Sequence, residues 1–253
     1  TLGAKIKNKP TGSFSDISIT SFYGSHIISC AGNGGMLLTN DKKIYERAKV
    51  LRSWGRMSTL YKDSENIKNR LNIKLRGYDY DKKFVFSEIG YNFEPSELGA
   101  SFGLVQLKKF KKFNIIRNRN FNLHLNYFSK HKDYFIVPKV EKNIKTNFLA
   151  YPIIIKESKK FTRKELQIYL ENHKIQTRPI FTGNILRHPA FKNIINNRNK
   201  INQFKNSDYI MRNGILIGCH QGLKKFDINK YVWLQKKKYF NNIEKIICTS
   251  NWM

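Results

Sequence analysis

The chain has 253 residues, 40% of them hydrophobic and 13% aromatic, which is enough for one large domain or two modest ones with apolar cores. Its formal net charge of +29 would suit a nucleic-acid-binding protein. The lysines, however, are spread over the whole chain and accompany many Asn and Ile residues, which share A/T-rich codons. Neither a zinc finger nor an aromatic RNA-binding pattern accompanies them, so we expect no nucleic-acid partner.

The apolar runs and the cysteines narrow the class further. Runs such as Tyr151–Ile155 are far shorter than the roughly 20 residues that a membrane-spanning helix needs. The first ten residues have no apolar signal-peptide core. Cys30, Cys219 and Cys248 stand far apart, which predicts neither a disulfide framework nor a zinc site. We therefore expect a cytoplasmic protein with no membrane partner and no bound metal.

Apolar periodicity and capping residues predict a mixed order of strands and helices. In chain order these are strands over 15–23 and 35–39, a helix over 41–53, a charged loop over 55–81, a helix from Ser96 toward Phe128, a strand over 148–155, a helix over 162–172, a strand over 175–181, a polar loop, a strand over 214–218 and a helix over 227–241. Asp41, Ser96 and Thr162 are the expected caps. The alternation is typical of an α/β fold with a boundary along the long helix near residue 113.

The turn after the first strand carries groups that could bind a ligand. Ser21 and Ser25 supply hydroxyls beside His26, and the glycines of 32–35 would let backbone N–H groups approach an anion. The end of a strand at the rim of a sheet is where α/β proteins bind ligands. Taken alone, a serine near glycines is more often part of a turn than of a phosphate site.

Three segments together carry a more specific pattern. The first is Ser21-Phe22-Tyr23-Gly24-Ser25-His26, followed by a Gly-Gly pair and a strand that ends in Thr39-Asn40-Asp41. The second runs from Gly90-Tyr91-Asn92 through Ser96-Glu97 to Gln106-Leu107. The third is Thr177–Asn184 with Arg187-His188-Pro189, and the runs 51–56 and 77–80 agree with it. In this order they resemble the DegT/DnrJ/EryC1/StrS family, and within it the nucleotide-sugar 3-dehydratase subgroup.

The resemblance implies the C-terminal part of a fold-type-I, pyridoxal-phosphate-dependent transferase. Residues 1–112 would be the remnant of the large cofactor-binding domain, and residues 113–253 the small C-terminal domain. A large N-terminal portion, which holds the residue that stacks on the cofactor ring and the acid that pairs with its pyridine nitrogen, would precede Thr1. We therefore expect an N-terminally truncated chain that is inactive alone because it cannot hold the cofactor tightly.

His26 occupies the position at which the family's aminotransferases carry the lysine that binds pyridoxal phosphate covalently. An imidazole cannot form that stable bond, but it exchanges protons near neutral pH. This suits a catalytic base that works with pyridoxamine phosphate on a 4-keto sugar that loses its C3 hydroxyl. The resemblance thus implies 3-dehydration of a nucleotide-linked 4-keto-6-deoxyhexose, as in lipopolysaccharide deoxysugar routes. A core histidine in an inactive homologue is the simpler alternative.

Other site residues and partners follow from the same resemblance. Ser21 would bind the cofactor phosphate, and Asn92 would reach the phosphate of the neighbouring subunit's cofactor, which makes a homodimer part of the site. Arg178, Arg187 and His188 could hold substrate phosphates or a co-substrate carboxylate, although surface salt bridges explain them equally well.

The resemblance also bears on how the cofactor is restored. Some dehydratases of the subgroup carry an iron–sulfur cluster just after the Trp-Gly-Arg run, but residues 57–70 contain no cysteine, so we expect no cluster. Glutamate would then regenerate the pyridoxamine form.

Two other functions stay open at this point. A sugar aminotransferase is the nearer one, and His26 disfavours it because lysine normally performs the proton transfers of transamination. The other is an inactive fragment or a basic nucleic-acid-binding protein.

Overall fold

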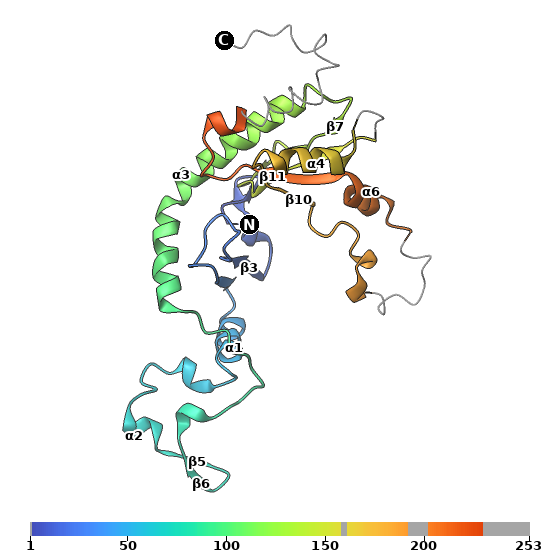
Figure 1. Ribbon diagram of the computed structural model, residues 1–253. Coiled ribbons are helices and arrows are strands. Elements are labelled where there is room, and N and C mark those ends of the chain that lie inside the picture. The colour runs from blue at the N-terminus through green and yellow to red at the C-terminus, as the bar shows by residue number, and fades with distance from the viewer. Residues whose placement is uncertain (1, 158–160, 192–201, 230–253) are drawn as a thin grey trace. The chain divides into compact units, whose positions relative to one another are not determined.

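A computed structural model describes residues 2–157, 161–191 and 202–229. The chain forms two compact units, residues 1–109 and 110–253, which divide it within the long helix α3 (Glu97–Phe128) (Figure 1). Each unit is described by itself below.

The first unit begins with two hairpins. Their strands are β1 (Lys5–Ile6), β2 (Lys9–Pro10), β3 (Ile17–Ser21) and β4 (Gly35–Thr39), with the short helix η1 (Thr11–Phe14) between β2 and β3. β3 and β4 pair antiparallel, from Ile17 opposite Thr39 to Ser21 opposite Gly35. Both strands were predicted from their short apolar runs, and the structure confirms them.

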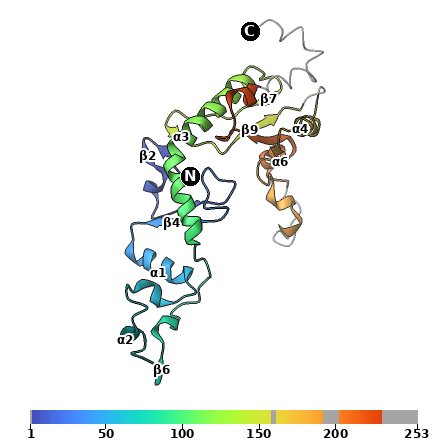
Figure 2. The same ribbon diagram turned by 60° about the vertical axis from the view of Figure 1, so that its left-hand side comes forward.

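Helix α1 (Lys42–Arg52) follows β4 directly. The carboxylate of Asp41 accepts hydrogen bonds from the backbone N–H groups of Lys43 and Ile44 at 2.7 and 3.1 Å, which confirms the predicted cap. The segment beyond α1 was predicted to be one long loop, and this is only partly right. It contains five short elements, which are η2 (Met57–Leu60), α2 (Ile67–Arg70), the paired strands β5 (Ile73–Leu75) and β6 (Tyr78–Tyr80), and η3 (Lys82–Phe84) (Figure 2).

The β5–β6 hairpin turns on two residues with left-handed backbone. Leu75 pairs with Tyr78, so Arg76 and Gly77 form the turn, and their φ angles are 51° and 93°. Two positive φ angles in a two-residue loop give the twist that joins antiparallel strands well. The usual sequence signal is Asn-Gly, and the arginine in its place explains why the hairpin was not predicted.

The second unit is built around a four-stranded sheet in the order β10-β11-β9-β7. Its strands are β7 (Phe135–Ile136), β9 (Ala150–Ile155), β10 (Thr177–Arg178) and β11 (Gly214–Gly218), and all of these pairings are antiparallel. Helices α4 (Arg163–Asn172) and α6 (Lys205–Asn213) belong to this unit, as does the second half of α3 (Figure 1). The remaining short elements are β8 (Ile144–Lys145), η4 (Ile185–Arg187) and η5 (Pro189–Phe191).

Alternation along β9 defines the core of this unit. Tyr151, Ile153 and Ile155 are buried while their neighbours are partly exposed, as a strand with one covered face requires. From α3, Phe121 and Phe128 pack on Tyr151 with ring centroids 5.0 and 5.6 Å away. From α4, the side chains of Leu166, Tyr169 and Leu170 enter the same cluster. Thr162 and Glu165 cap α4 reciprocally, which confirms the predicted cap.

Two predictions in this unit need correction. The strand over 175–181 is shorter than expected, because Pro179 has no N–H to donate and Phe181 has a φ of 48°. The polar loop after it was predicted to continue to residue 214, but α6 occupies its last part. The predicted helix over 227–241 lies mostly outside the described residues. The last described residues, 225–229, are helical.

The inner face of α3 is polar where it meets the end of β11. Arg117, Asn120 and His124 are all at least 97% buried. Arg117 donates to Gln221 and to the carbonyls of Phe148 and Leu149 at 2.7 to 3.1 Å. Asn120 donates to the carbonyl of His220, and His124 Nε2 lies 3.0 Å from the carbonyl of Gly218. These side chains make hydrogen bonds with backbone carbonyls just before β9 and at the end of β11, where the sheet provides no partner.

Burial lowers the pKa of His124 to about 4, although the nearby Gly218 carbonyl opposes the shift. The unfolded state, with a histidine pKa near 6.5, therefore binds more protons than the folded state between pH 6.5 and 4. We expect the free energy of unfolding to fall by about 3 kcal/mol over that range through this one group. Urea unfolding followed by circular dichroism at each pH would measure it.

The matched control is His124→Gln, which keeps a donor for Gly218 and removes the titration. Its unfolding free energy should be lower at pH 7 but should fall less steeply toward pH 4. Any remaining slope should come from groups such as His220, whose pKa burial and Arg117 also lower. Equal slopes for the parent and the variant would contradict the assignment.

The described part of the chain has no helix that is long and apolar enough to cross a bilayer. Over the same residues, no group of three or more His, Cys, Asp or Glu side chains could hold a metal ion.

Candidate functional site

His26 lies in the loop that joins β3 to β4. The hairpin hydrogen bonds continue past the strands, because Phe22 N–H donates to Gly34 and Gly24 N–H donates to Gly32, both at 2.8 Å. Tyr23 then links two predicted site residues: its N–H donates to Ser21 Oγ at 3.2 Å, and its carbonyl accepts from His26 N–H at 2.9 Å. Ser21 and His26 are therefore held on one short turn.

The side chains on this turn divide into an exposed and a buried set. Ser21 and His26 are exposed, whereas Ile27 and Ile28 are only 7% and 5% exposed. No hydrogen bond joins the His26 imidazole to any described residue. The two buried isoleucines anchor the loop, and the imidazole next to them stays available to a ligand.

Cys30 fixes the other end of this loop against α3. An added β-carbon on Gly99 would lie 3.0 Å from the Cys30 carbonyl oxygen, and one on Gly103 would overlap Cys30 Sγ. Gly34, which has a φ of 144°, closes the slot from the loop itself, at 2.9 Å from Cys30 Cβ by the same measure. The thiol thus fills a space that only glycines leave open.

This contact predicts that a Gly→Ala change in a helix lowers the free energy of unfolding, which is the opposite of the usual effect. A helical Gly→Ala change normally stabilises by up to about 1 kcal/mol. We expect Gly103→Ala to destabilise the protein by about 1–3 kcal/mol instead, because the methyl group would overlap Cys30 Sγ. Denaturant unfolding measures the change.

In a Cys30→Ala background the same Gly103→Ala change should become neutral or stabilising. The nearest remaining atom of residue 30 would then be its Cβ, 3.7 Å away. If the change costs the same in both backgrounds, the thiol is not what excludes a side chain at position 103.

Asn92 is placed by a separate pair of glycines. A β-carbon on Gly55 would overlap the Glu88 carbonyl, and one on Gly90 would overlap the backbone of Gly55. The two chain segments can therefore touch, and Tyr91 and Phe93 donate to the carbonyls of Leu51 and Arg52 at 2.7 and 2.9 Å. The side chain of Asn92 between them is exposed and makes no hydrogen bond to the described residues.

In the second unit, Arg187 is engaged by an acid. Its Nε and Nη2 atoms donate to the two carboxylate oxygens of Asp208, each at 2.5 Å, and Asn184 Nδ2 donates to the same carboxylate at 2.8 Å. The hydrogen bond from Arg187, followed by that from Asn184, lowers the pKa of Asp208 to about 2. The carboxylate therefore stays charged, and the planar guanidinium is committed to it.

Arg178 and His188 lie on either side of Arg187 in the sequence. Arg178 ends β10 with an exposed side chain that has no partner among the described residues. His188 is half-buried, and its Nε2 lies 2.9 Å from the Thr182 carbonyl. Of the three predicted substrate contacts, Arg178 thus has the freest charge.

Sequence reasoning missed Asp208 and Asn184. Asn184 was part of a quoted segment but had no assigned role, and Asp208 lies in a helix that was not predicted. An acidic residue in an otherwise basic and amide-rich stretch is the one signal that could have indicated a partner for Arg187.

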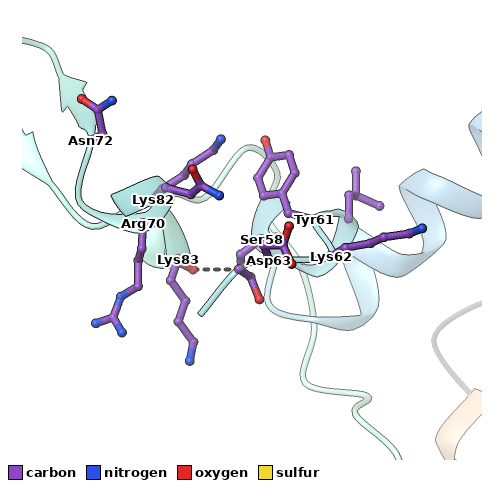
Figure 3. A pocket seen from close by; sticks show the side chains of 11 residues that line it. Ser58, Tyr61, Lys62, Asp63, Arg70, Asn72, Lys82 and Lys83 are labelled. Carbon is purple, nitrogen blue, oxygen red and sulfur yellow. Dashed lines mark hydrogen bonds between the residues drawn. The ribbon is translucent and has the colours of Figure 1, made fainter. Parts of the chain in front are cut away.

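The segment after α1 also encloses a cavity of about 460 Å³ (Figure 3). Its walls come from η2, α2 and η3, and none of the six predicted site residues lines it. Two of its four cations are in ion pairs: Arg70 with Asp81 at 2.7 Å and Lys83 with Glu65 at 2.5 Å. Lys82 lies over the Tyr61 ring at 4.2 Å. These pairs hold the segment together and leave little free charge for a ligand.

The His26 loop of the β3–β4 hairpin and the small antiparallel sheet of the second unit belong to a chain of the mixed α/β class, as the sequence predicted. The sequence profile of the DegT/DnrJ/EryC1/StrS aminotransferase family matches residues 1–233. The chain belongs to this family, as the three segments predicted.

The relatives with named activities include sugar dehydratases. The chain is 31% identical over 226 residues to the dTDP-4-dehydro-2,6-dideoxy-D-glucose 3-dehydratase of Saccharopolyspora spinosa, covering 88% of this chain and 48% of that one. It is 29% identical over 232 residues to the GDP-4-keto-6-deoxy-D-mannose 3-dehydratase of Escherichia coli O55:H7, covering 91% and 57%. The chain thus spans about half the length of the curated relatives it matches.

Solved structures agree with this. A GDP-4-keto-6-deoxymannose-3-dehydratase with a trapped PLP-glutamate geminal diamine superposes with a TM-score of 0.73 at 27% identity, covering 93% of this chain and 57% of that one. The prediction of a C-terminal part of this fold is confirmed.

Proposed function

We propose that the protein takes part in the 3-dehydration of a nucleotide-linked 4-keto-6-deoxyhexose, with pyridoxamine or pyridoxal phosphate as cofactor. The observation that carries the proposal is the exposed imidazole of His26, which makes no hydrogen bond to the described residues and belongs to the segment that resembles the family's lysine box. Two relatives named as 3-dehydratases support it. Lipopolysaccharide or related deoxysugar synthesis in the cytoplasm is the setting we propose.

The residues on the turn fit such a cofactor. The Ser21 hydroxyl accepts one hydrogen bond from Tyr23 N–H and keeps its own proton to donate to a phosphate oxygen. The exposed amide of Asn92 can donate to the phosphate of a second subunit's cofactor. When bound, the cofactor supplies the electron sink for loss of the C3 hydroxyl.

His26 supplies the proton transfers in this proposal. Because its ring nitrogens make no hydrogen bond to the described residues, the unprotonated one would be available to take a proton from C4′ of a bound cofactor. The imidazolium can then pass a proton to the departing hydroxide. The buried side chains of Ile27 and Ile28 anchor the backbone next to the ring.

Arg178 is the residue we assign first to the phosphates of the nucleotide sugar, since its guanidinium is exposed and uncommitted. His188, which directly follows η4, can contribute as well. Arg187 acts with Asp208, so we propose that it supports the substrate site indirectly. Glutamate is the proposed amino donor that restores the cofactor, in keeping with the PLP–glutamate adduct of the related structure.

The test of the proposal changes His26 in the protein expressed from its complete reading frame and supplied with pyridoxamine phosphate. With a 4-keto-6-deoxy nucleotide sugar as substrate, His26→Asn should slow turnover about 10²- to 10⁴-fold, because a general base is lost. Cofactor binding, measured by fluorescence titration, should persist. Turnover at the parent rate would exclude His26 as the base.

His26→Lys separates the dehydratase from an aminotransferase. The variant should hold pyridoxal phosphate covalently, seen as an absorbance band that the parent lacks, and should gain some amino-transfer product. A lysine adduct that borohydride traps in the parent itself would contradict the dehydratase assignment.

We also propose a homodimer, because the first half of α3 presents an apolar stripe to solvent. Leu98, Phe102 and Val105 follow a helical spacing on one face, and they are 85%, 45% and 48% exposed. Gly99 and Gly103, which face Cys30, lie on another face of the helix. An exposed contiguous apolar stripe indicates a surface that another protein covers.

Leu98→Lys should raise the dimer dissociation constant at least about tenfold, because a charge would be buried without a partner. Ile115→Lys is the matched control, as it changes another exposed apolar residue of α3 outside the stripe. Sedimentation velocity measures both. An unchanged dissociation constant for Leu98→Lys would place the subunit contact elsewhere.

A further inference from the structure

Phe181 is an aromatic side chain displayed on a strained turn. It is 78% exposed, and its φ of 48° lies in the left-handed region, which bulky residues rarely adopt. The turn is closed by a 3.2 Å hydrogen bond from Gly183 N–H to the Ile180 carbonyl. Strain of this kind persists where the surrounding structure enforces it, and it is commonest at functional sites.

The surrounding structure enforces it through α6. Asp208 on α6 accepts hydrogen bonds from Asn184 and, at both oxygens, from Arg187. Asp208 and Asn184 are only 8% and 3% exposed, so water competes little for these contacts. Residues 181–188 are therefore tied to the helix at two points three residues apart.

A third contact lies directly beside Phe181. Gly183, with a φ of 61°, approaches α6 so closely that a β-carbon there would overlap Met211. Arg163 of α4 in turn donates to the Met211 carbonyl at 3.1 Å. The turn is thus rigidly backed, while the described residues leave the Phe181 ring uncovered.

We propose that Phe181 is a stacking platform for the base of a nucleotide ligand, and that Asp208 is the positioning residue that holds it in place. The inference rests on the proposed function for the identity of the ligand. A rigid exposed ring suits a flat aromatic partner, since base–aromatic stacking needs no matched hydrogen bonds. The free guanidinium of Arg178, three residues before Phe181, can bind the phosphates of the same ligand.

Direct binding tests this without any turnover. GDP and dTDP, the nucleotides in the names of the two relatives, are titrated calorimetrically into the protein from its complete reading frame. Pyrophosphate serves as the probe without a base. Phe181→Leu should weaken binding of the better nucleotide about 5- to 100-fold and leave pyrophosphate affinity unchanged. Phe181→Tyr, which keeps an aromatic ring, should bind like the parent.

The positioning role has its own arm. Asp208→Asn keeps the size of the side chain but removes the charge that orders Arg187, so nucleotide affinity should fall while pyrophosphate affinity does not. In a Phe181→Leu background the same change should cause little further loss, because the platform it positions is gone. If the losses of nucleotide affinity from Asp208→Asn and Phe181→Leu simply multiply in the double variant, Asp208 does not position Phe181.

Several results would overturn the inference. These are unchanged nucleotide affinity in Phe181→Leu, an equal loss for pyrophosphate, or a shift of the dimer equilibrium in its place, which would assign Phe181 to a subunit contact. The proposed function can fail separately. If the protein binds nucleotide through Phe181 but does not dehydrate the sugar, the proposed reaction is wrong and the role of Phe181 stands. If the Phe181→Leu variant dehydrates the sugar at the parent rate and with the same KM, the role of Phe181 is wrong and the proposed reaction stands.

Discussion

The contact between Cys30 and the glycines of α3 is the constraint on which the His26 loop depends. An interior glycine costs helix stability, yet α3 carries two, one turn apart, where the loop approaches. The gain is a backbone separation short enough for the thiol to fill the space completely. With Cys30 held at one end and the β3–β4 ladder at the other, the turn between them has little freedom left. His26 can be exposed and still be well placed.

The elements that could be predicted from the sequence are helices that are capped by neighbouring residues and strands that bury only one face. Asp41, Ser96 and Thr162 cap helices through their own neighbours, and β9 alternates because one of its faces is buried. Helix α6 escaped prediction because two of its buried residues, Asp208 and Asn213, are polar. Apolar periodicity gives a weak signal for a helix whose most buried residues are polar. The end of β10 depends likewise on a positive φ at Phe181, a residue type that gives no warning of it.

The candidate site divides in the same way. His26 and Ser21 could be singled out because a turn of small residues after a strand, taken together with two further segments, fits few families. For Arg187 the sequence left a phosphate contact and a salt bridge equally open, and its bidentate partner Asp208 is 21 positions away in a helix that was not predicted. The sequence does not distinguish an arginine whose guanidinium is in an ion pair from one whose guanidinium is available to a ligand. The difference lies in tertiary contacts, and here it transfers the phosphate-binding assignment from Arg187 toward Arg178.

The exposure of His26 has a consequence for where the chemistry can occur. A base that moves a proton between a cofactor and a departing hydroxide works best where bulk water is excluded, since water would compete for both partners. In this chain the imidazole is open, Asn92 projects from another segment of the same unit, and the apolar stripe of Leu98, Phe102 and Val105 is uncovered. All three features have one economical explanation. If a second subunit covers the stripe, the amide of Asn92 comes within reach of that subunit's cofactor. Closure of the site and assembly of the dimer are then the same event, and the open imidazole is what an enzyme of this design should show in a single chain.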